Sequence, residues 1–259
     1  MGYETMRKFM ITATAALMAL TTSACAYMDS DEEQRADNEV GAVAGTMAGG
    51  SGETTTRSYA VTGFTGIVAA GSDKIEVTRG DSFAVTATGA PELLDRLIIR
   101  VKDGDLEVRR RSGTWNGNGS ATIRVTMPAL DEVTVAGSGD VTADRLSGDA
   151  VEVTVAGSGN VRFAAVDVRK LEMTIAGSGK VEATGTADWI EATIAGSGDI
   201  VAPELTAARA EISIAGSGNI AMAVTDSAAV STIGSGNVTL TGGATCTHDR
   251  MGGGEVNCS

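Results

Sequence analysis

The most regular feature of the chain is an alternation of apolar and polar residues between positions 131 and 241. In Glu132-Val133-Thr134-Val135 every second residue is apolar and β-branched, which is the pattern of a strand with one buried face. Aligned copies of this segment form three apolar columns, which we expect to stack inside the fold. The columns are Val133, Val153, Met173, Ala192 and Ile212; Val135, Val155, Ile175, Ile194 and Ile214, continued by Thr232 or Ile233; and Val141, Val161, Val181, Ile200, Ile220 and Val238.

A pair of glycines flanking a serine separates the columns in every copy, and the first glycines are 20, 20, 19, 20 and 18 residues apart. Such a period indicates a solenoid, whose repeats bury their apolar faces against one another. We interpret Gly-Ser-Gly-Asx as a sharp corner in which Gly and Asx adopt left-handed backbone. The corner glycines are Gly137, Gly139, Gly157, Gly159, Gly177, Gly179, Gly196, Gly198, Gly216, Gly218, Gly234 and Gly236. The sequence therefore predicts an all-β fold, a right-handed parallel β-helix with coils of about 20 residues.

The two flanks of the repeats show weaker patterns. Residues 58–130 contain alternating segments such as Lys74–Thr78 and a helical turn at Pro91–Leu97, and we expect these strands to cover or extend the N-terminal end of the β-helix. The repeated coils occupy 131–241, and residues 242–259 are predicted to be a C-terminal capping loop. In an exported protein, Cys246 and Cys258 are expected to form a disulfide that pins this cap.

The N-terminus has the features of an export signal over residues 1–26. Arg7-Lys8 precede an apolar run, Phe9–Leu20, that is too short to span a bilayer. Cleavage after Ala26 and lipidation of Cys25, as in a bacterial lipoprotein, are two alternatives that the residues leave open. The start is Met1 or Met6, and residues 27–57 are expected to form a disordered acidic and Gly-rich linker. We therefore expect an exported protein of the periplasm, outer membrane or cell surface, with any membrane attachment through Cys25.

The charge balance narrows the class of partner. The formal net charge is −13, which argues against binding to nucleic acid. One outward column contains only glutamates, and it predicts either a solvated acidic surface or a line of calcium sites. This column is Glu132, Glu152, Glu172, Glu191 and Glu211. Arg145, Arg162, Arg169, Lys170 and Arg209 are available to offset its charge.

Candidate catalytic chemistry is sparse in this sequence. The one histidine, His248, lies in the predicted cap, so a metal site of ordinary ligand spacing and a Ser-His-acid arrangement are not expected. Asp140 and Asp199 share a corner line, which leaves open a polysaccharide-cleaving β-helix. We assign no catalytic residue, no metal ligand and no cofactor.

Several segments, in order along residues 59–240, resemble one bacterial family. They are the strands from Tyr59, the Pro91–Leu97 turn, Asp105-Leu106-Glu107-Val108, the Met127-Pro128-Ala129-Leu130 break and the Gly-Ser-Gly coils. Together they are similar to the family described as "putative auto-transporter adhesin, head GIN domain". The resemblance implies an exported β-helical domain and brings no catalytic residues.

These observations lead to two functional hypotheses of different classes. The first is a non-enzymatic adhesin or scaffold of the cell envelope, whose partner is a surface protein or a glycan not identified by the sequence. The alternative is a periplasmic protein that binds or cleaves polysaccharide. Oligomeric state is not predicted.

Overall fold

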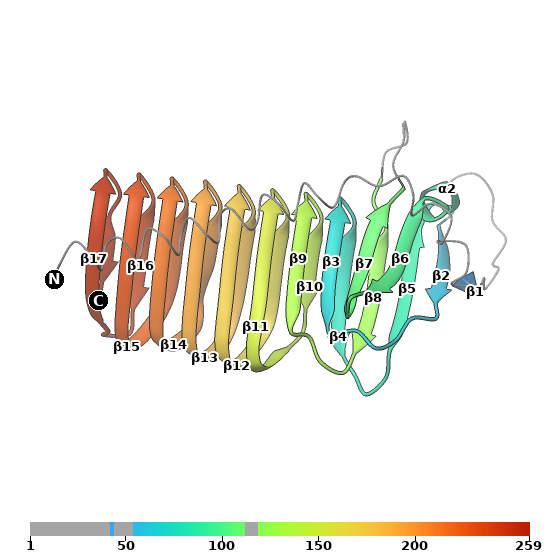
Figure 1. Cartoon of the computed structure of the whole chain (residues 1–259), viewed down its shortest axis with the longest axis horizontal. Coiled ribbons are helices and arrows are strands. Elements are labelled where there is room, and N and C mark those ends of the chain that lie inside the picture. The colour runs from blue at the N-terminus through green and yellow to red at the C-terminus, as the bar shows by residue number, and fades with distance from the viewer. Residues whose placement is uncertain (1–41, 44–53, 112–118) are drawn as a thin grey trace. The chain divides into compact units, whose positions relative to one another are not determined.

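The computed structural model describes residues 42–43, 54–111 and 119–259. Strands make up most of these residues, and those of the repeated region lie side by side along one axis (Figure 1). These strands are β9 (Glu132–Gly137), β10 (Asp140–Ala143), β11 (Leu146–Gly157), β12 (Asn160–Gly177), β13 (Lys180–Gly196), β14 (Asp199–Gly216), β15 (Asn219–Gly234) and β16 (Asn237–Thr241). Within the described part of the chain, no helix is long and apolar enough to cross a bilayer.

Equivalent residues of successive coils pair directly with one another. Val135 is the register partner of Val155, and Val155 is the partner of Ile175. The same column continues through Ile194, Ile214 and Thr232. The predicted parallel β-helix with coils of about 20 residues is thereby confirmed. At the last step Thr232 occupies the inward position and is 4% exposed, whereas Ile233 points outward and is 48% exposed.

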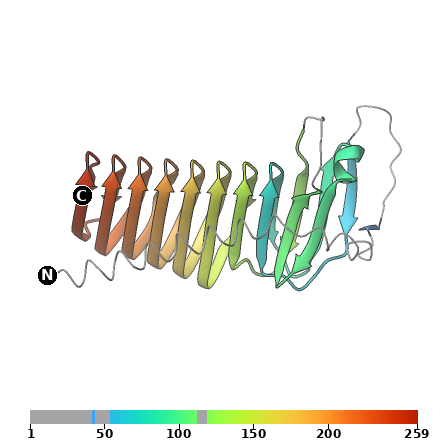
Figure 2. The ribbon, with the colours of Figure 1, turned by 45° about the horizontal axis from the view of Figure 1, so that its top comes forward.

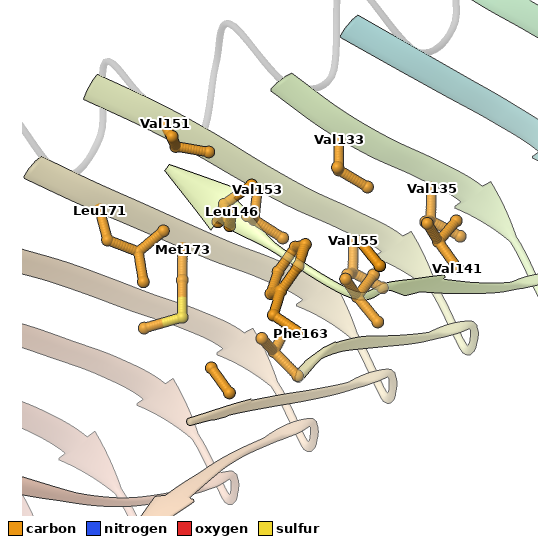
Figure 3. Close-up of a cluster of buried hydrophobic side chains, with 14 of the residues drawn as sticks. Val133, Val135, Val141, Leu146, Val151, Val153, Val155, Phe163, Leu171 and Met173 are labelled. Atoms are coloured by element: carbon orange, nitrogen blue, oxygen red, sulfur yellow. The ribbon is translucent and has the colours of Figure 1, made fainter. Parts of the chain in front are cut away.

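Stacked aliphatic side chains fill the interior of the coils (Figure 3). Val133, Val153 and Met173 are register partners on successive strands and are fully buried. Leu146 and Phe163 point into the same interior (Figure 3). Each fully buried side chain of this size contributes about 1.5–3 kcal/mol to folding. Repetition of this contribution along the axis explains how a chain with 3% aromatic residues forms a continuous core.

The glycine corners are tight because backbone stacks on backbone there. Gly177 has φ +135°, and a Cβ at this position would lie 2.3 Å from the carbonyl oxygen of Gly157. A Cβ on Gly179 would lie 2.5 Å from the Gly159 oxygen. The expectation that the following Asx residue adopts left-handed backbone was wrong, because among the described non-glycine residues only Asp103 has positive φ. The Asx residues instead begin the next strand.

The regular stack begins earlier in the sequence than predicted. β3 (Gly66–Gly71) and β4 (Lys74–Arg79) form a coil that pairs in parallel with β9 and β10, with Gly71 opposite Gly137. On their other side they pair with β7 (Asp105–Arg110) and β8 (Thr122–Met127), which come later in the chain. The predicted division at residue 130 is therefore no boundary in the stack.

Antiparallel strands cover the N-terminal end of this stack. β6 (Leu97–Lys102) pairs with β7, β5 (Ala84–Gly89) pairs with β8, and β2 (Thr55–Tyr59) pairs with β5. A short helix, α2 (Pro91–Leu94), forms over the first part of the predicted turn, beside the antiparallel strands (Figure 2). Its two leucines are buried. The free edges of the parallel strands β7 and β8 are thus occupied, as expected for the open end of a solenoid.

The predicted linker is partly wrong. β1 (Ala42–Val43) pairs antiparallel with β2, so residues 42–43 and 55–57 belong to strands. Alternating exposure along Thr55–Tyr59 explains why this segment joins the sheet. The rest of the linker, the predicted signal peptide 1–26, Cys25 and the choice between Met1 and Met6 lie outside the described residues.

The C-terminal segment forms a further coil, not the capping loop that was predicted. β17 (Thr245–Gly252) continues the register of β15, with Gly252 opposite Gly234, and β18 (Val256–Cys258) pairs with β16. Cys246 and Cys258 form a disulfide with Cα atoms 6.6 Å apart. Gly252-Gly253-Gly254 provides the corner that the Gly-Ser-Gly pattern did not reveal.

Candidate functional site

Outward side chains of β9 and of the equivalent strand segments form an ordered surface, which we call the glutamate–threonine face. Register pairing aligns its columns, so that Glu152 lies between Glu132 and Glu172, and Thr154 lies between Thr134 and Thr174. Each coil is separated from the next by about 4.8 Å. The face consists of Glu132, Glu152, Glu172, Glu191 and Glu211; Thr134, Thr154, Thr174, Thr193 and Ser213; and Ala136, Ala156, Ala176, Ala195 and Ala215.

The glutamate column carries uneven charge compensation. Lys170 contacts two adjacent carboxylates, with Nζ 3.1 Å from Glu172 Oε2 and 3.3 Å from Glu191 Oε2. At the ends of the column, burial raises the pKa of the Glu132 and Glu211 carboxyls above the ordinary value, and neighbouring carboxylates raise each further. At neutral pH the carboxylates of this column therefore repel one another, and Lys170 reduces the repulsion at its centre.

The other cations expected to offset this column have different partners. Arg162 pairs with Glu182 at 2.6 Å, and Arg169 pairs with Asp149 at 2.8 Å. Arg209 lies over the ring of Trp189, with Cζ 5.6 Å from its centroid. The calcium alternative gains no support, since no group of three or more His, Cys, Asp or Glu residues among the described positions could hold a metal ion.

The residues that follow the corners form a side-chain ladder. Asp140 Oδ1 accepts hydrogen bonds from the Asn160 side-chain amide at 2.7 Å and from its backbone N–H at 3.2 Å. Asp199 makes the same two contacts with Asn219, at 2.8 and 3.0 Å. Asp140 and Asp199 are three coils apart, which corresponds to about 14 Å. A glycosidase places its two carboxyls within about 10 Å, so this line does not form such a pair.

A groove opens on another side of the β-helix, beyond the glycine corners. It has a volume of about 500 Å³. Here the strand register shifts between neighbouring coils, between Phe163 and Val166 in β12 and between Glu182 and Gly185 in β13. The lining residues come from β12, β13 and β14, and they are Arg162, Phe163, Ala164, Glu182, Ala183, Thr184, Val201, Pro203 and Glu204. We call this site the bulge groove.

Sequence reasoning missed the bulge groove, although a signal for it was present. The repeat steps of 19 and 18 residues depart from 20 because the number of residues at these bulges differs from coil to coil. Pro203 is also the one proline within the repeated region 131–241. Variation at one corner of an otherwise fixed repeat indicates a site where the coil outline is not constrained by stacking.

A family model matches residues 63–244, and its description is "Putative auto-transporter adhesin, head GIN domain". The match covers well over half of the chain and the whole set of regular corners. The chain belongs to the head GIN domain family. The predicted resemblance is thereby confirmed, over nearly the residues on which it was based.

Solved structures show the same fold as this head GIN domain. A crystal structure described as a "putative adhesin" from Bacteroides fragilis has a TM-score of 0.75 and 25% identity, covering 81% of this chain and 98% of its own. One described as a "putative lipid binding protein" from Parabacteroides distasonis has a TM-score of 0.68, with the same identity and coverage. A "putative adhesin" from Parabacteroides merdae, at 22% identity and TM-score 0.66, shows the fold alone. Comparison with curated proteins gives no match.

The remaining predicted site residues of the head GIN domain lie at its C-terminal coil. His248 is exposed on β17, opposite Val230 of the preceding coil. The nearby cysteines are joined in the disulfide and so hold no free thiol. Arg250 donates from Nη1 to the carbonyl oxygen of Gly254 at 2.8 Å, which helps to close the last coil.

Proposed function

We propose that this head GIN domain is a non-enzymatic binding module of the cell envelope, an adhesin or scaffold, and that it binds its partner through the glutamate–threonine face. The observation that carries the proposal is the in-register repetition of Glu, Thr and Ala over five coils. An enzyme builds one site from residues that occur once. This face repeats the same residue types at a constant spacing, as the extended binding surfaces of solenoids do.

Repetition also explains how small side chains could give useful affinity. One threonine hydroxyl or one half-buried carboxylate binds weakly in water, because each exchanges one hydrogen-bonding partner for another. Several equivalent contacts on one rigid surface act together, so the effective affinity exceeds that of any single contact. A surface protein or a glycan with a regular outline is the kind of partner that benefits. The family description as an adhesin supports this class of function.

The location follows as part of the same proposal. An adhesin or scaffold acts at the periplasm, the outer membrane or the cell surface, and Cys25 is the residue that would carry a lipid anchor. Labelling of the full chain with radioactive palmitate tests the anchor, because label should enter the wild type and be lost in Cys25→Ser. Equal label in both proteins would remove Cys25 from the proposal.

The binding role is tested with two matched pairs of substitutions in β13 and its neighbours. Thr174→Arg with Thr193→Arg places two bulky cations on the glutamate–threonine face. Thr186→Arg with Thr206→Arg makes the same change at outward positions of β13 and β14 outside this face, where Thr186 and Thr206 are register partners. The probe is retention of the full chain on immobilised collagen, fibronectin, laminin and a glycan array. We expect the first pair to abolish retention on the immobilised proteins and the second to leave it unchanged.

The alternative of polysaccharide cleavage is decided by a reducing-sugar assay on the polysaccharides of the same array. Release of product by the wild type would contradict the non-enzymatic proposal. Equal retention by both double variants would show that another surface carries binding.

A further inference from the structure

The bulge groove has an apolar wall that is accessible to a ligand. Phe163 and Ala183 also line the groove, but they are buried, at 1% and 4% exposed, and the Phe163 side chain points into the core (Figure 3). Val201 and Pro203 stand at the wall. Val201 is 38% exposed and is one of three large hydrophobic residues with this degree of exposure in the described part of the chain; the others are Ile233 and Met251. Val201 lines the bulge groove.

The polar groups of the bulge groove include both donors and acceptors. Arg162 uses Nη2 to contact Glu182 Oε2 at 2.6 Å, and its side chain is 67% exposed, which leaves guanidinium N–H groups facing solvent. Lys180 also pairs with Glu182. Glu204 is exposed at the rim, and Thr184 adds a hydroxyl. Lys180 does not line the groove, so the charged lining residues are one cation, Arg162, and two carboxylates, Glu182 and Glu204, with a net charge of −1.

This combination favours one class of ligand. A sugar hydroxyl both donates and accepts hydrogen bonds, so adjacent hydroxyls fit a site where a guanidinium donates and carboxylates accept. The C–H face of a pyranose ring is apolar and fits against Val201 and Pro203. The net negative charge of the lining disfavours an anionic polysaccharide, and its charged groups disfavour a purely apolar chain. A volume of about 500 Å³ lies within the range of small-ligand sites.

We propose that the bulge groove binds a neutral glycan, with the ring packed on Val201 and Pro203 and its hydroxyls bonded by Arg162 and Glu204. This inference rests on the proposed function as a binding module. It adds a second and separate site, because the bulge groove and the glutamate–threonine face share no residue.

The test uses the full chain on an array of neutral gluco-, manno- and galacto-configured oligosaccharides beside galacturonate oligosaccharides, with affinities measured by calorimetry. Val201→Arg fills the wall and adds a charge. Its matched control is Ile233→Arg, the same change at an exposed aliphatic residue away from the groove. Glu204→Gln removes one acceptor charge, and Glu255→Gln is its control on β-helix surface outside the groove.

We expect the wild type to bind at least one neutral oligosaccharide. Val201→Arg should weaken that binding by tenfold or more, which corresponds to about 1.4 kcal/mol. Glu204→Gln should weaken it severalfold. Both controls should bind as the wild type does, and all four variants should keep the wild-type melting temperature within a few degrees. Three results would overturn the proposal: no binding of neutral oligosaccharides, a preference for galacturonate, or unchanged binding by Val201→Arg. Retention on matrix proteins that persists in Val201→Arg would show that the glutamate–threonine face acts independently, so failure of one site is distinguishable from failure of the other.

Discussion

The N-terminal region, residues 54–130, and the repeated coils that follow it solve the same stacking problem by different means. In the repeated coils, glycine corners let backbones approach closely and aliphatic columns fill the interior. In the N-terminal region the stack is assembled out of sequence order, and both buried acidic residues of the described chain, Asp73 and Glu107, are found there. The coils repeat one arrangement of apolar columns and glycine corners, whereas the N-terminal region adds individual buried polar contacts to its part of the same apolar core.

At Asp73 a buried polar contact replaces a corner glycine of the repeated coils. It stands where the next coil has Gly139, and its carboxylate is bound by Arg110 through Nε at 2.9 Å and Nη2 at 2.6 Å. Oδ1 also accepts the backbone N–H of Ala121 at 2.7 Å. The carboxylate thus contacts Arg110 at the end of β7 and Ala121 just before β8. Glu107 has a similar role, since it accepts from Nε of Arg100 and of Arg109.

The largest effect is expected from a corner glycine in the coils. Gly177→Ala should destabilise the domain by more than about 4 kcal/mol, because the methyl group meets the Gly157 carbonyl and φ of +135° is unfavourable for alanine. Urea unfolding followed by circular dichroism measures this loss. Gly63→Ala is the control in the N-terminal region: its φ is +80° but nothing lies within 4 Å of the added atom, so a loss of about 1 kcal/mol is expected. Equal losses would show that backbone strain, rather than close stacking, dominates at the corners.

The regular coils could be predicted because three independent features of the sequence indicated the same alignment of the repeats. β-Branched columns, turn residues and a constant period all pointed to one register, and Val135, Val155 and Ile175 became neighbours as expected. The coil of β3 and β4 could not be recognised, because Asp73 replaces its second glycine. Its place between residues 105–127 and 132–143 depends on pairing between segments distant in sequence. No local periodicity specifies such an order.

Of the two candidate sites, the glutamate–threonine face could be predicted from the sequence and the bulge groove could not. The glutamate column followed from alternation, since a period of two fixes which side chains face outward. The bulge groove depends on how unequal bulges of β12, β13 and β14 lie beside one another, and this is set by tertiary register. Arg162 and Arg169 were expected only to be available to the glutamate column, and they pair with Glu182 and Asp149 instead, because long side chains reach several columns and sequence spacing does not choose among them.

An intermediate effect should come from making the N-terminal region resemble the coils. Asp73→Gly restores the Gly-Ser-Gly corner yet should destabilise the domain by about 3 kcal/mol, because Arg110 and the Ala121 N–H lose their buried partner. Asp73→Asn keeps an acceptor and should lose less. Urea midpoints of the two variants against the wild type give the comparison. A stable Asp73→Gly variant would mean that the glycine corner suffices at both ends of the fold.

The smallest effect concerns Glu132, which lies where the two regions meet. Burial, reinforced by the carboxylates of Asp105 and Glu152, raises the pKa of Glu132 above its ordinary value in the folded chain. The folded state therefore holds this proton more tightly than the unfolded state, and stability falls as pH rises from the unfolded pKa through the folded pKa. Glu132→Gln removes the charge, so it should stabilise the domain at pH 7 by less than about 1 kcal/mol, since the half-buried site is screened by solvent.

The advantage of Glu132→Gln should vanish below about pH 4, where the wild-type carboxyl is protonated in both states. Glu182 provides a control of opposite sign, because hydrogen bonding and attraction from Lys180, together with Arg162, hold its pKa below the ordinary value. Its ionised form stabilises the fold above the unfolded pKa, and this contribution is lost as pH falls through the folded pKa. Glu182→Gln should therefore destabilise the domain at pH 7 and be neutral in acid. Melting temperatures of both variants between pH 3 and pH 8 should diverge in opposite directions from the wild type as pH rises. Curves that shift together would mean that net charge, not the local surroundings of each carboxyl, controls stability across the junction.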